Sequence, residues 1–326
     1  MKVVASAPGK VILVGEHFVV YGEPALVMAI NLYVQTSVEA RSDNIIHISS
    51  SLGPSGFFKG DEFRPEHGGD EARKTLMPIK IAAETTMNSL NERNGLNIEV
   101  TSTLPAAIGL GSSGALAVAT VAAVSRLLGT NLKKKSIVDL STEAERYVHI
   151  NPSGVDQTIS TYGGIISYKK DEGILRIKTK FSIPLVIGNT GVIRDTGRLV
   201  DSVRQKIERL SDVLVPLISV AGKLTVNSIS ALKRGDLEEL GMLMDVNQGL
   251  LKAIGVSNEV LDRLIYAAKQ GGALGAKLTG AGGGGCMVAL SRLEERENVA
   301  QSISDAGGTT IIAEKEDRGV RSWSVK

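Results

Sequence analysis

The sequence is poor in the residues that support disulfide, zinc and nucleic-acid chemistry. One cysteine, Cys286, occurs in 326 residues, so no disulfide can form within the chain and a reducing compartment is the default. The four histidines, His17, His47, His67 and His149, include no i, i+4 pair and no cysteine partner, which argues against a zinc site. The net charge is only +2, and no basic tail or stripe favours a nucleic-acid partner.

The sequence also lacks a long unbroken apolar segment and a leader-like start. The uncharged stretch from Val100 to Ser125 is split by Pro105 and by glycines and serines, so its helical half is too short to span a bilayer. The first residues, Met1 to Ala7, are strand-like and do not resemble a signal peptide. We therefore expect a cytoplasmic protein with no membrane partner.

Length and patterning predict two domains in an α+β fold. A chain of 326 residues that is 43% hydrophobic and 22% charged suits two globular domains of ordinary size. The first third is β-rich, and helical and mixed patterns follow it. We place the boundary in the charged stretch 169–180, which gives domains of residues 1–178 and 179–326.

Alternation and helical spacing predict the individual elements. The expected strands are 3–4 and 11–14, flanking a turn at 7–9, then 25–30, 33–40, 45–49, 97–102, 165–168, 174–178, 185–188, 286–290, 309–313 and 320–325. The expected helices are 79–90, 115–128, 136–149, 199–214, 219–232, 237–254 and 260–268. Residues 52–69, rich in glycine, proline and charge, are expected to form a surface loop or flap.

The most informative segment is a glycine-rich turn between a strand and an apolar helix. It comprises Pro105, Ala106, Ala107, Ile108, Gly109, Leu110, Gly111, Ser112, Ser113 and Gly114. Such a turn presents backbone N–H groups and the positive end of a helix dipole to one point, which favours a phosphate. The serine hydroxyls can reach a phosphate oxygen or Mg²⁺. The alternative is a structural corner with a serine N-cap, and the segment is neither a Walker A motif nor a dinucleotide fingerprint.

A second segment, residues 7–25, carries Lys10, Glu16 and His17 beside two apolar strands. Charges between core strands are costly unless they are paired. The segment is therefore either part of a functional site or a structural ion pair at the end of a strand.

A third segment, residues 145–156, runs from Glu145 to Asp156 through Asn151-Pro152. Thr142 with Glu145, and Ser153 with Asp156, both have the spacing of a capping box. The first box lies inside a helical pattern and is doubtful. In the second, a base at the start of a helix is compatible with a cap, because the dipole favours its charged form.

A fourth segment, residues 275–290, contains four consecutive glycines before a strand. Such a run costs chain entropy, so it indicates close backbone approach or unusual φ angles. Contact of Gly282 and Gly283 with a ligand is one explanation. Tight packing against the first glycine loop is the other.

These four segments together, in this order, resemble the GHMP kinases, a family that comprises galactokinases, homoserine kinases, mevalonate kinases and phosphomevalonate kinases. The resemblance spans nearly the whole chain, and the first and third segments are most similar to the mevalonate kinase branch. It implies an N-terminal α+β domain with the phosphate loop, a ferredoxin-like C-terminal domain and an active site in the cleft between them. The sequence departs from the family at residues 106–108 and at Gly114, where an alanine is common.

The resemblance implies ATP-dependent phosphorylation of the 5-hydroxyl of mevalonate, with Mg²⁺ as cofactor. Asp156 would be the general base and Lys10 its partner, while Ser113 and Glu145 would hold Mg²⁺. The loop 105–114 would bind the ATP phosphates. The substrate-binding residues would be Glu16, His17, Asp156, Thr196, Gly282 and Gly283. A homodimer is common among such relatives.

Two other functions remain open at this point. A phosphomevalonate kinase would need further cations for its substrate phosphate, and Lys10 and Arg194 are the nearby candidates. A metabolite sensor without catalysis would be marked by loss of Lys10, Asp156 or Glu145, and all three are present.

Overall fold

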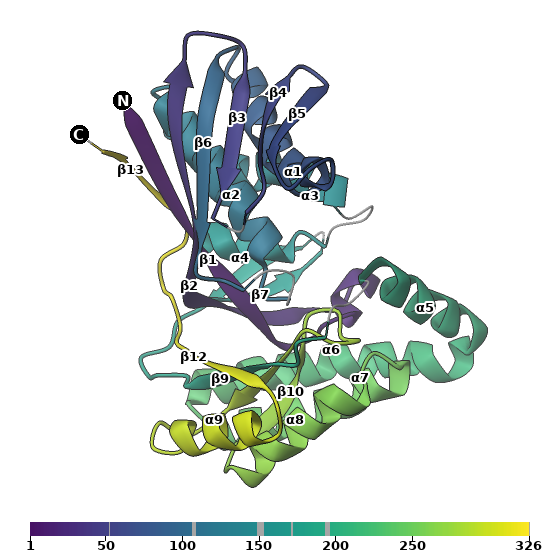
Figure 1. Ribbon diagram of the computed structural model, residues 1–326. Helices are drawn as coiled ribbons and strands as arrows, with labels where there is room; N and C mark the ends of the chain where they lie inside the picture. Colours follow the sequence, from purple (N-terminus) through teal and green to yellow (C-terminus); the bar gives the residue numbers. More distant parts are fainter. Residues whose placement is uncertain (52, 106–108, 149–152, 171, 193–195, 326) are drawn as a thin grey trace.

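The computed structural model describes all residues except 52, 106–108, 149–152, 171, 193–195 and 326. Within the described residues, the strands form a nine-stranded and a four-stranded sheet. Each sheet has its own helices, and one layered unit lies above the other in Figure 1. The predicted α+β fold with two domains is confirmed.

The larger sheet belongs mainly to the first half of the chain. Its strands are β1 (Lys2–Val14), β2 (Ala25–Arg41), β3 (Ile46–Ser50), β4 (Ser55–Lys59), β5 (Glu62–His67), β6 (Gly95–Ser102), β7 (Ile165–Lys169), β8 (Gly173–Ile177) and β13 (Arg321–Val325). The order is β13-β1-β2-β6-β3-β4-β5, and the β7–β8 hairpin pairs with the first residues of β2. The C-terminal strand β13 therefore returns to the first sheet, which a boundary at residue 178 does not anticipate.

Helices pack on this sheet, and the glycine-rich turn before α2 lies at its lower end in Figure 1. They are α1 (Glu71–Ser89), α2 (Ser112–Leu127), α3 (Lys134–Val148) and α4 (Val155–Tyr162). The 3₁₀ turn η1 (Phe18–Tyr21), between β1 and β2, instead contacts a helix of the second half of the chain. Most of α2 is buried against β1, β2 and its neighbouring helices, because its side chains are small and apolar on nearly every face. Burial fixes the N-terminus of α2 rigidly relative to β1.

The smaller sheet has the strand order of a ferredoxin-like domain. Its strands are β9 (Leu185–Asn189), β10 (Gly275–Thr279), β11 (Cys286–Leu290) and β12 (Thr309–Ala313), in the order β10-β11-β9-β12 with antiparallel pairs. Its helices are α5 (Thr196–Arg209), α6 (Ser211–Arg234), α7 (Leu237–Ile254), α8 (Glu259–Gln270) and α9 (Arg296–Asp305). Counted from β9, the order is 2-3-1-4, as in a β-α-β-β-α-β unit with an enlarged first helical connection.

Several elements differ from the sequence prediction. Residues 7–9 do not form a turn but a register shift between Pro8 and Gly9 inside the continuous strand β1. The expected loop 52–69 contains the β4–β5 hairpin. The expected helix 199–214 is divided near Leu210 into α5 and α6. Strand β10 and helix α9 are absent from the prediction.

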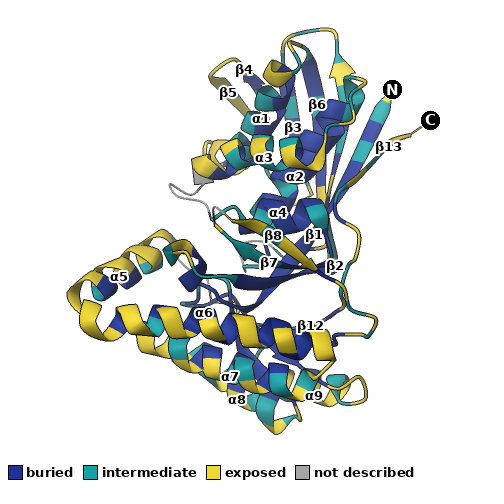
Figure 2. Cartoon of the chain, turned by 180° about the vertical axis from the view of Figure 1, so that it is seen from behind, coloured by how far each residue is buried: buried dark blue, intermediate teal, exposed yellow. Residues whose placement is uncertain are grey.

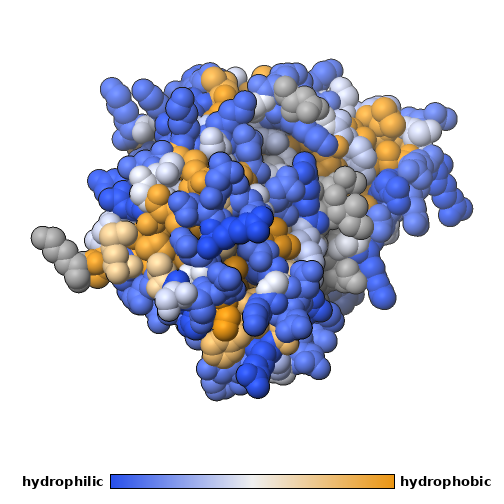
Figure 3. Space-filling view, turned by 90° about the horizontal axis from the view of Figure 1, so that it is seen from above, coloured by the Kyte–Doolittle hydropathy of each residue, from blue (hydrophilic) through white to orange (hydrophobic). Residues whose placement is uncertain are grey.

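Helix α6 is, among the described residues, the one helix long and apolar enough to cross a membrane by length and composition, with 33% of its apolar window buried. This is weak evidence for a span, because core helices pass the same test. Buried and exposed residues alternate along α6 (Figure 2), and Leu214, Ile218 and Ala221 belong to the second hydrophobic core. Seen from above, the molecule is mostly hydrophilic with scattered apolar patches (Figure 3), as is ordinary for a protein surface.

Candidate active site

The glycine-rich turn ends at the N-terminus of α2, which begins three residues earlier than predicted. Gly111 is the N-cap residue, with a φ of 76° and no side-chain cap hydrogen bond, so the serine cap of the structural alternative is not found. Gly109 also has a positive φ, 92°. Pro105 is partly buried and Leu110 is buried. Ala106, Ala107 and Ile108 lie outside the described residues.

Strand β1 holds this turn in place. The backbone N–H of Lys10 donates to the carbonyl of Leu110 at 2.8 Å. A Cβ on Gly9 would lie 2.9 Å from the same carbonyl, and a Cβ on Gly111 would lie 2.8 Å from Cγ of Lys10. The two glycines thus allow the strand and the turn to touch, which places the Lys10 side chain directly beside the start of α2.

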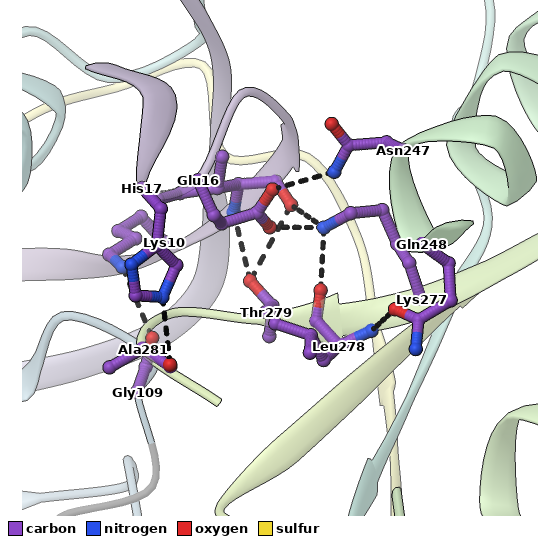
Figure 4. Close-up of polar contacts among 11 residues, drawn as sticks. Lys10, Glu16, His17, Gly109, Asn247, Gln248, Lys277, Leu278, Thr279 and Ala281 are labelled. Atoms are coloured by element: carbon purple, nitrogen blue, oxygen red, sulfur yellow. Dashed lines mark hydrogen bonds and ion pairs between the residues drawn. The ribbon is translucent and has the colours of Figure 1, made fainter. Parts of the chain in front are cut away.

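Lys10 and Asp156, 146 positions apart in sequence, form an ion pair at this point. Lys10 Nζ lies 3.3 Å from Asp156 Oδ1, and the two side chains are 4% and 27% exposed. Lys10 Nζ also donates to the carbonyl of Gly109 at 3.1 Å (Figure 4). A buried ammonium therefore connects the carboxylate to the glycine-rich turn.

Asp156 lies in the first turn of α4, close to the helix α2. The N-cap of α4 is Gly154, with a φ of 79°, so the predicted capping box from Ser153 to Asp156 does not form as such. A Cβ on Gly114 would lie 2.7 Å from Cβ of Asp156. Glycine at 114 therefore lets α2 approach α4 closely at the carboxylate.

Ser113 and Glu145 form a second polar pair next to the first. Ser113 Oγ donates to Glu145 Oε2 at 2.9 Å. Burial and the nearby Asp156 charge raise the pKa of Glu145 to about 7. Thr142 donates to the carbonyl of Val138 at 2.8 Å inside α3, so the other predicted capping box is not present.

Ser113 and Glu145 have the chemistry of a Mg²⁺ site. Both supply hard oxygen atoms, and Mg²⁺ is usually held by one or two carboxylates together with substrate phosphates and water. The described residues include no group of three or more His, Cys, Asp or Glu side chains that would hold a metal by themselves. The pair therefore fits an ion that arrives with a nucleotide, beside the phosphate turn.

Glu16 has a different environment from the one predicted. Its side chain is 1% exposed and forms an ion pair with Lys277 of β10, and its Oε2 accepts from Asn247 Nδ2 at 3.2 Å. The alternative of a structural ion pair at the end of a strand therefore describes Glu16, with Lys277 as its partner. Figure 4 shows Lys277 and Asn247 both directed at the Glu16 carboxylate.

His17 faces the loop that follows β10. Its Nε2 lies 2.8 Å from the carbonyl of Ala281, so Nε2 carries the hydrogen and donates it. His17 is 9% exposed and has a φ of 60°, which is rare for a residue with a side chain. The predicted substrate residues His17 and Gly282 thus lie near each other in the structure.

The glycine run after β10 is explained by its backbone conformation and its packing. Gly282, Gly283, Gly284 and Gly285 all have positive φ angles. A Cβ on Gly282 would lie 2.1 Å from the carbonyl of Val256, and one on Gly284 would lie 2.7 Å from that of Val192. These contacts are within the second domain, whereas the sequence analysis offered the first glycine loop as the packing partner.

The remaining predicted residues are less informative. Thr196 is the first residue of α5, but its side chain is outside the described part of the structure, as is Arg194.

Sequence reasoning missed Lys277 and Asn247 as partners of Glu16. Lys277 stood in the fourth segment, where a lone lysine between apolar residues was the available signal.

Comparisons with known proteins identify relatives over the whole length. The family GHMP kinases N terminal domain matches residues 78–164, and GHMP kinases C terminal matches residues 228–309. The mevalonate kinase of Pyrococcus furiosus is 40% identical over 98% of both chains. That of Pyrococcus horikoshii is 42% identical over 98% of this chain and 97% of the relative. The crystal structure of L. major mevalonate kinase in complex with R-mevalonate has a TM-score of 0.81 at 28% identity, covering 96% of each chain.

Proposed function

Because this chain belongs to the GHMP kinase family, and within it to the mevalonate kinases, we propose that the site around Lys10 and Asp156 transfers the γ-phosphoryl group of ATP to the 5-hydroxyl of mevalonate. The products are 5-phosphomevalonate and ADP, in isoprenoid biosynthesis. The observation that carries the assignment to this site is the Lys10–Asp156 ion pair, 3.3 Å apart beside the phosphate-loop turn.

The reaction needs an oriented alcohol, a proton acceptor and positive charge near the phosphates. The 5-hydroxyl oxygen bonds to the γ-phosphorus, while the bond between that phosphorus and the β–γ bridging oxygen breaks and ADP leaves. Asp156 accepts the hydroxyl proton as general base. Lys10 balances the carboxylate charge and stabilises the negative charge that develops on the transferred group.

The turn 105–114 binds the ATP phosphates in this proposal. The N-terminus of α2 points its unpaired N–H groups at the site, and the helix dipole favours negative charge there. Glycine at 109 and 111 lets the backbone, rather than side chains, approach the phosphates. Lys10, which touches this turn, connects phosphate binding to the proton acceptor.

Ser113 and Glu145 are proposed to hold Mg²⁺ with the bound nucleotide. When bound, the ion neutralises phosphate charge, which assists phosphoryl transfer. Ser113 presents its hydroxyl from the first turn of α2, and Glu145 presents its carboxylate from α3 at 2.9 Å. Together they would supply two oxygen ligands close to Asp156, whose charge acts on Glu145.

The acceptor alcohol is proposed to bind on the side of the second domain. His17, Thr196, Gly282 and Gly283 are the residues assigned to mevalonate, with Asp156 at the reacting hydroxyl. Glu16 supports these residues indirectly and does not touch the substrate, because its carboxylate is buried against Lys277. We also propose that the enzyme is cytoplasmic and forms a homodimer.

The test is ADP release from ATP and Mg²⁺ with mevalonate, phosphomevalonate, galactose or homoserine as acceptor. We expect release with mevalonate and little with the other three. Release with phosphomevalonate instead would change the substrate while keeping the mechanism. ATP binding without ADP release from any acceptor would support a metabolite sensor and contradict the proposal.

A further inference from the structure

We propose that Lys277 is a positioning residue for phosphoryl transfer. Its buried ion pair with Glu16 holds the turn at residues 15–17 against the second domain and thereby orients His17 toward the acceptor. The same pair neutralises Glu16, so that Lys10 pairs with Asp156 alone. This inference rests on the proposed function, because it assigns a role within the same site. It differs from direct substrate binding, since Lys277 is completely buried.

The ion pair joins the two domains in a place that is buried from solvent. Glu16 follows β1 of the first sheet, and Lys277 lies in the middle of β10 of the second. Their side chains are 1% and 0% exposed. Lys277 Nζ also donates to the carbonyl of Leu278 at 2.5 Å and to that of Ile12 at 3.4 Å. The ammonium thus contacts backbone of both domains as well as the carboxylate.

The turn that carries Glu16 is attached to the second domain at several further points. Phe18 is 1% exposed and packs in the core of the second domain. A Cβ on Gly222 of α6 would lie 1.9 Å from Oε2 of Glu23, so this helix accepts the Glu23 side chain closely. The segment between β1 and β2 is therefore packed against the second domain, whereas Lys10 contacts the glycine-rich turn of the first.

His17 has the backbone conformation expected of a residue held by its surroundings. Together with Asn91, it is one of the non-glycine residues with a positive φ in the described part of the chain. Such a conformation costs free energy and persists where neighbouring contacts impose it. The Glu16 ion pair on one side and the Ala281 contact on the other supply those constraints.

Because Lys10 is also close to Glu16, the charge on Glu16 must be neutralised by a partner other than Lys10. Burial raises the pKa of Glu16 and lowers that of Lys277, and the nearby charge of Lys10 acts on both groups. Removing one member of a buried ion pair leaves the other charge uncompensated. Without Lys277, the Glu16 carboxylate would compete with Asp156 for Lys10.

The experiment compares three variants with the full-length wild type in steady state. Lys277→Met removes the ammonium and keeps the apolar stem. The double variant Glu16→Gln/Lys277→Met also removes the competing charge. Lys269→Met is the matched control, because Lys269 also pairs with a carboxylate, Asp245, at 2.8 Å and donates to the backbone carbonyl of Leu274, but belongs to the second domain alone.

For Lys277→Met we expect kcat to fall and the KM for mevalonate to rise, together reducing kcat/KM at least about 10-fold, since a misplaced reacting group can cost about 100-fold. The KM for ATP stays near the wild-type value. In the double variant kcat recovers while the KM for mevalonate remains raised. Lys269→Met changes thermal stability but none of these constants.

A Lys277→Met enzyme that is folded and has wild-type kcat and mevalonate KM would overturn the proposal. If that variant does not fold, the double variant decides, and a wild-type mevalonate KM there would also overturn it. Failure of the proposed function itself would be visible separately, as absence of ADP release in the wild type.

Discussion

Three buried or half-buried carboxylates at the site differ in their partners, and the partners separate their roles. Asp156 has Lys10 at 3.3 Å, Glu16 has Lys277 and Asn247, and Glu145 has the neutral hydroxyl of Ser113. A carboxylate beside an ammonium is suited to receive a proton transiently or to hold structure. Burial and the neighbouring Asp156 charge disfavour the anionic form of Glu145, and a bound cation would offset that cost, as in a metal site.

The raised pKa of Glu145 predicts a pH-dependent stability of the metal-free protein. Its pKa rises from 4.5 to about 7 on folding because of burial and the Asp156 charge. A raised carboxyl pKa stabilises the folded state below the unfolded value, and this contribution is lost as pH rises from 4.5 to about 7. The rise of the pKa from 4.5 to about 7 corresponds to roughly 3–4 kcal/mol, since one pKa unit is about 1.4 kcal/mol.

Denaturant unfolding of the metal-free protein between pH 4.5 and 8 measures this contribution. We expect Glu145→Gln to lose less stability over this range than the wild type. Glu143→Gln, an exposed neighbour on α3, is the control and should follow the wild type. Parallel pH dependences for wild type and Glu145→Gln would contradict the assigned pKa.

At the scale of elements, the glycine run after β10 gives the second prediction. Gly282→Ala places a Cβ 2.1 Å from the Val256 carbonyl at a φ of 77°, and both the clash and the strained backbone destabilise the fold. We expect a loss of at least about 1–3 kcal/mol in the free energy of unfolding. Gly249→Ala in α7, where a Cβ meets open space, should instead gain about 0.5–1 kcal/mol.

Chemical denaturation of the two variants at one pH measures both effects. The activity of folded Gly282→Ala is a second readout, because the loop also holds Ala281 against His17. If the Gly282→Ala protein were as stable as the Gly249→Ala protein, the predicted clash with the Val256 carbonyl would be contradicted.

The sequence predicted the elements whose signals are local. The apolar helix α2, the β7–β8 hairpin and strands β9, β11 and β12 were expected because periodicity and turn residues are read within a few positions. Pro8-Gly9 was misread as a turn, because a register shift against Tyr33 and Ile30 depends on the partner strand. Strand β10 was missed because its central lysine becomes compatible with burial only when Glu16 is present.

The same distinction holds for the site. Lys10, Asp156, Ser113 and Glu145 were chosen from motifs, and the structure brings them together in two adjacent pairs. The partner of Glu16 was not predictable, since Lys277 is 261 positions away and nothing in either segment specifies the pairing. Long-range pairing is a property of the fold and not of a motif.

At the scale of the whole molecule, the residues proposed for the reaction are divided between the two domains. The phosphate turn, Lys10, Asp156, Ser113 and Glu145 are mounted on the first sheet and its helices, and the segment with His17 is anchored in the second domain. Strand β1 belongs to both regions, because it begins beside β13 and ends at the Glu16 turn (Figure 1). In the proposed mechanism, the relative placement of the domains would therefore set the distance between the acceptor and the phosphates.

The most direct test of the account is single-turnover phosphoryl transfer by Asp156→Asn and by Lys10→Met, measured by rapid quench with ATP, Mg²⁺ and mevalonate. Calorimetric binding of mevalonate to each variant confirms that the acceptor site is intact. The account predicts that Asp156→Asn binds both substrates and transfers at least about 100-fold more slowly, the usual contribution of a general base, and that Lys10→Met is also severely impaired. Transfer at the wild-type rate in both variants would contradict the assignment of the reaction to this ion pair.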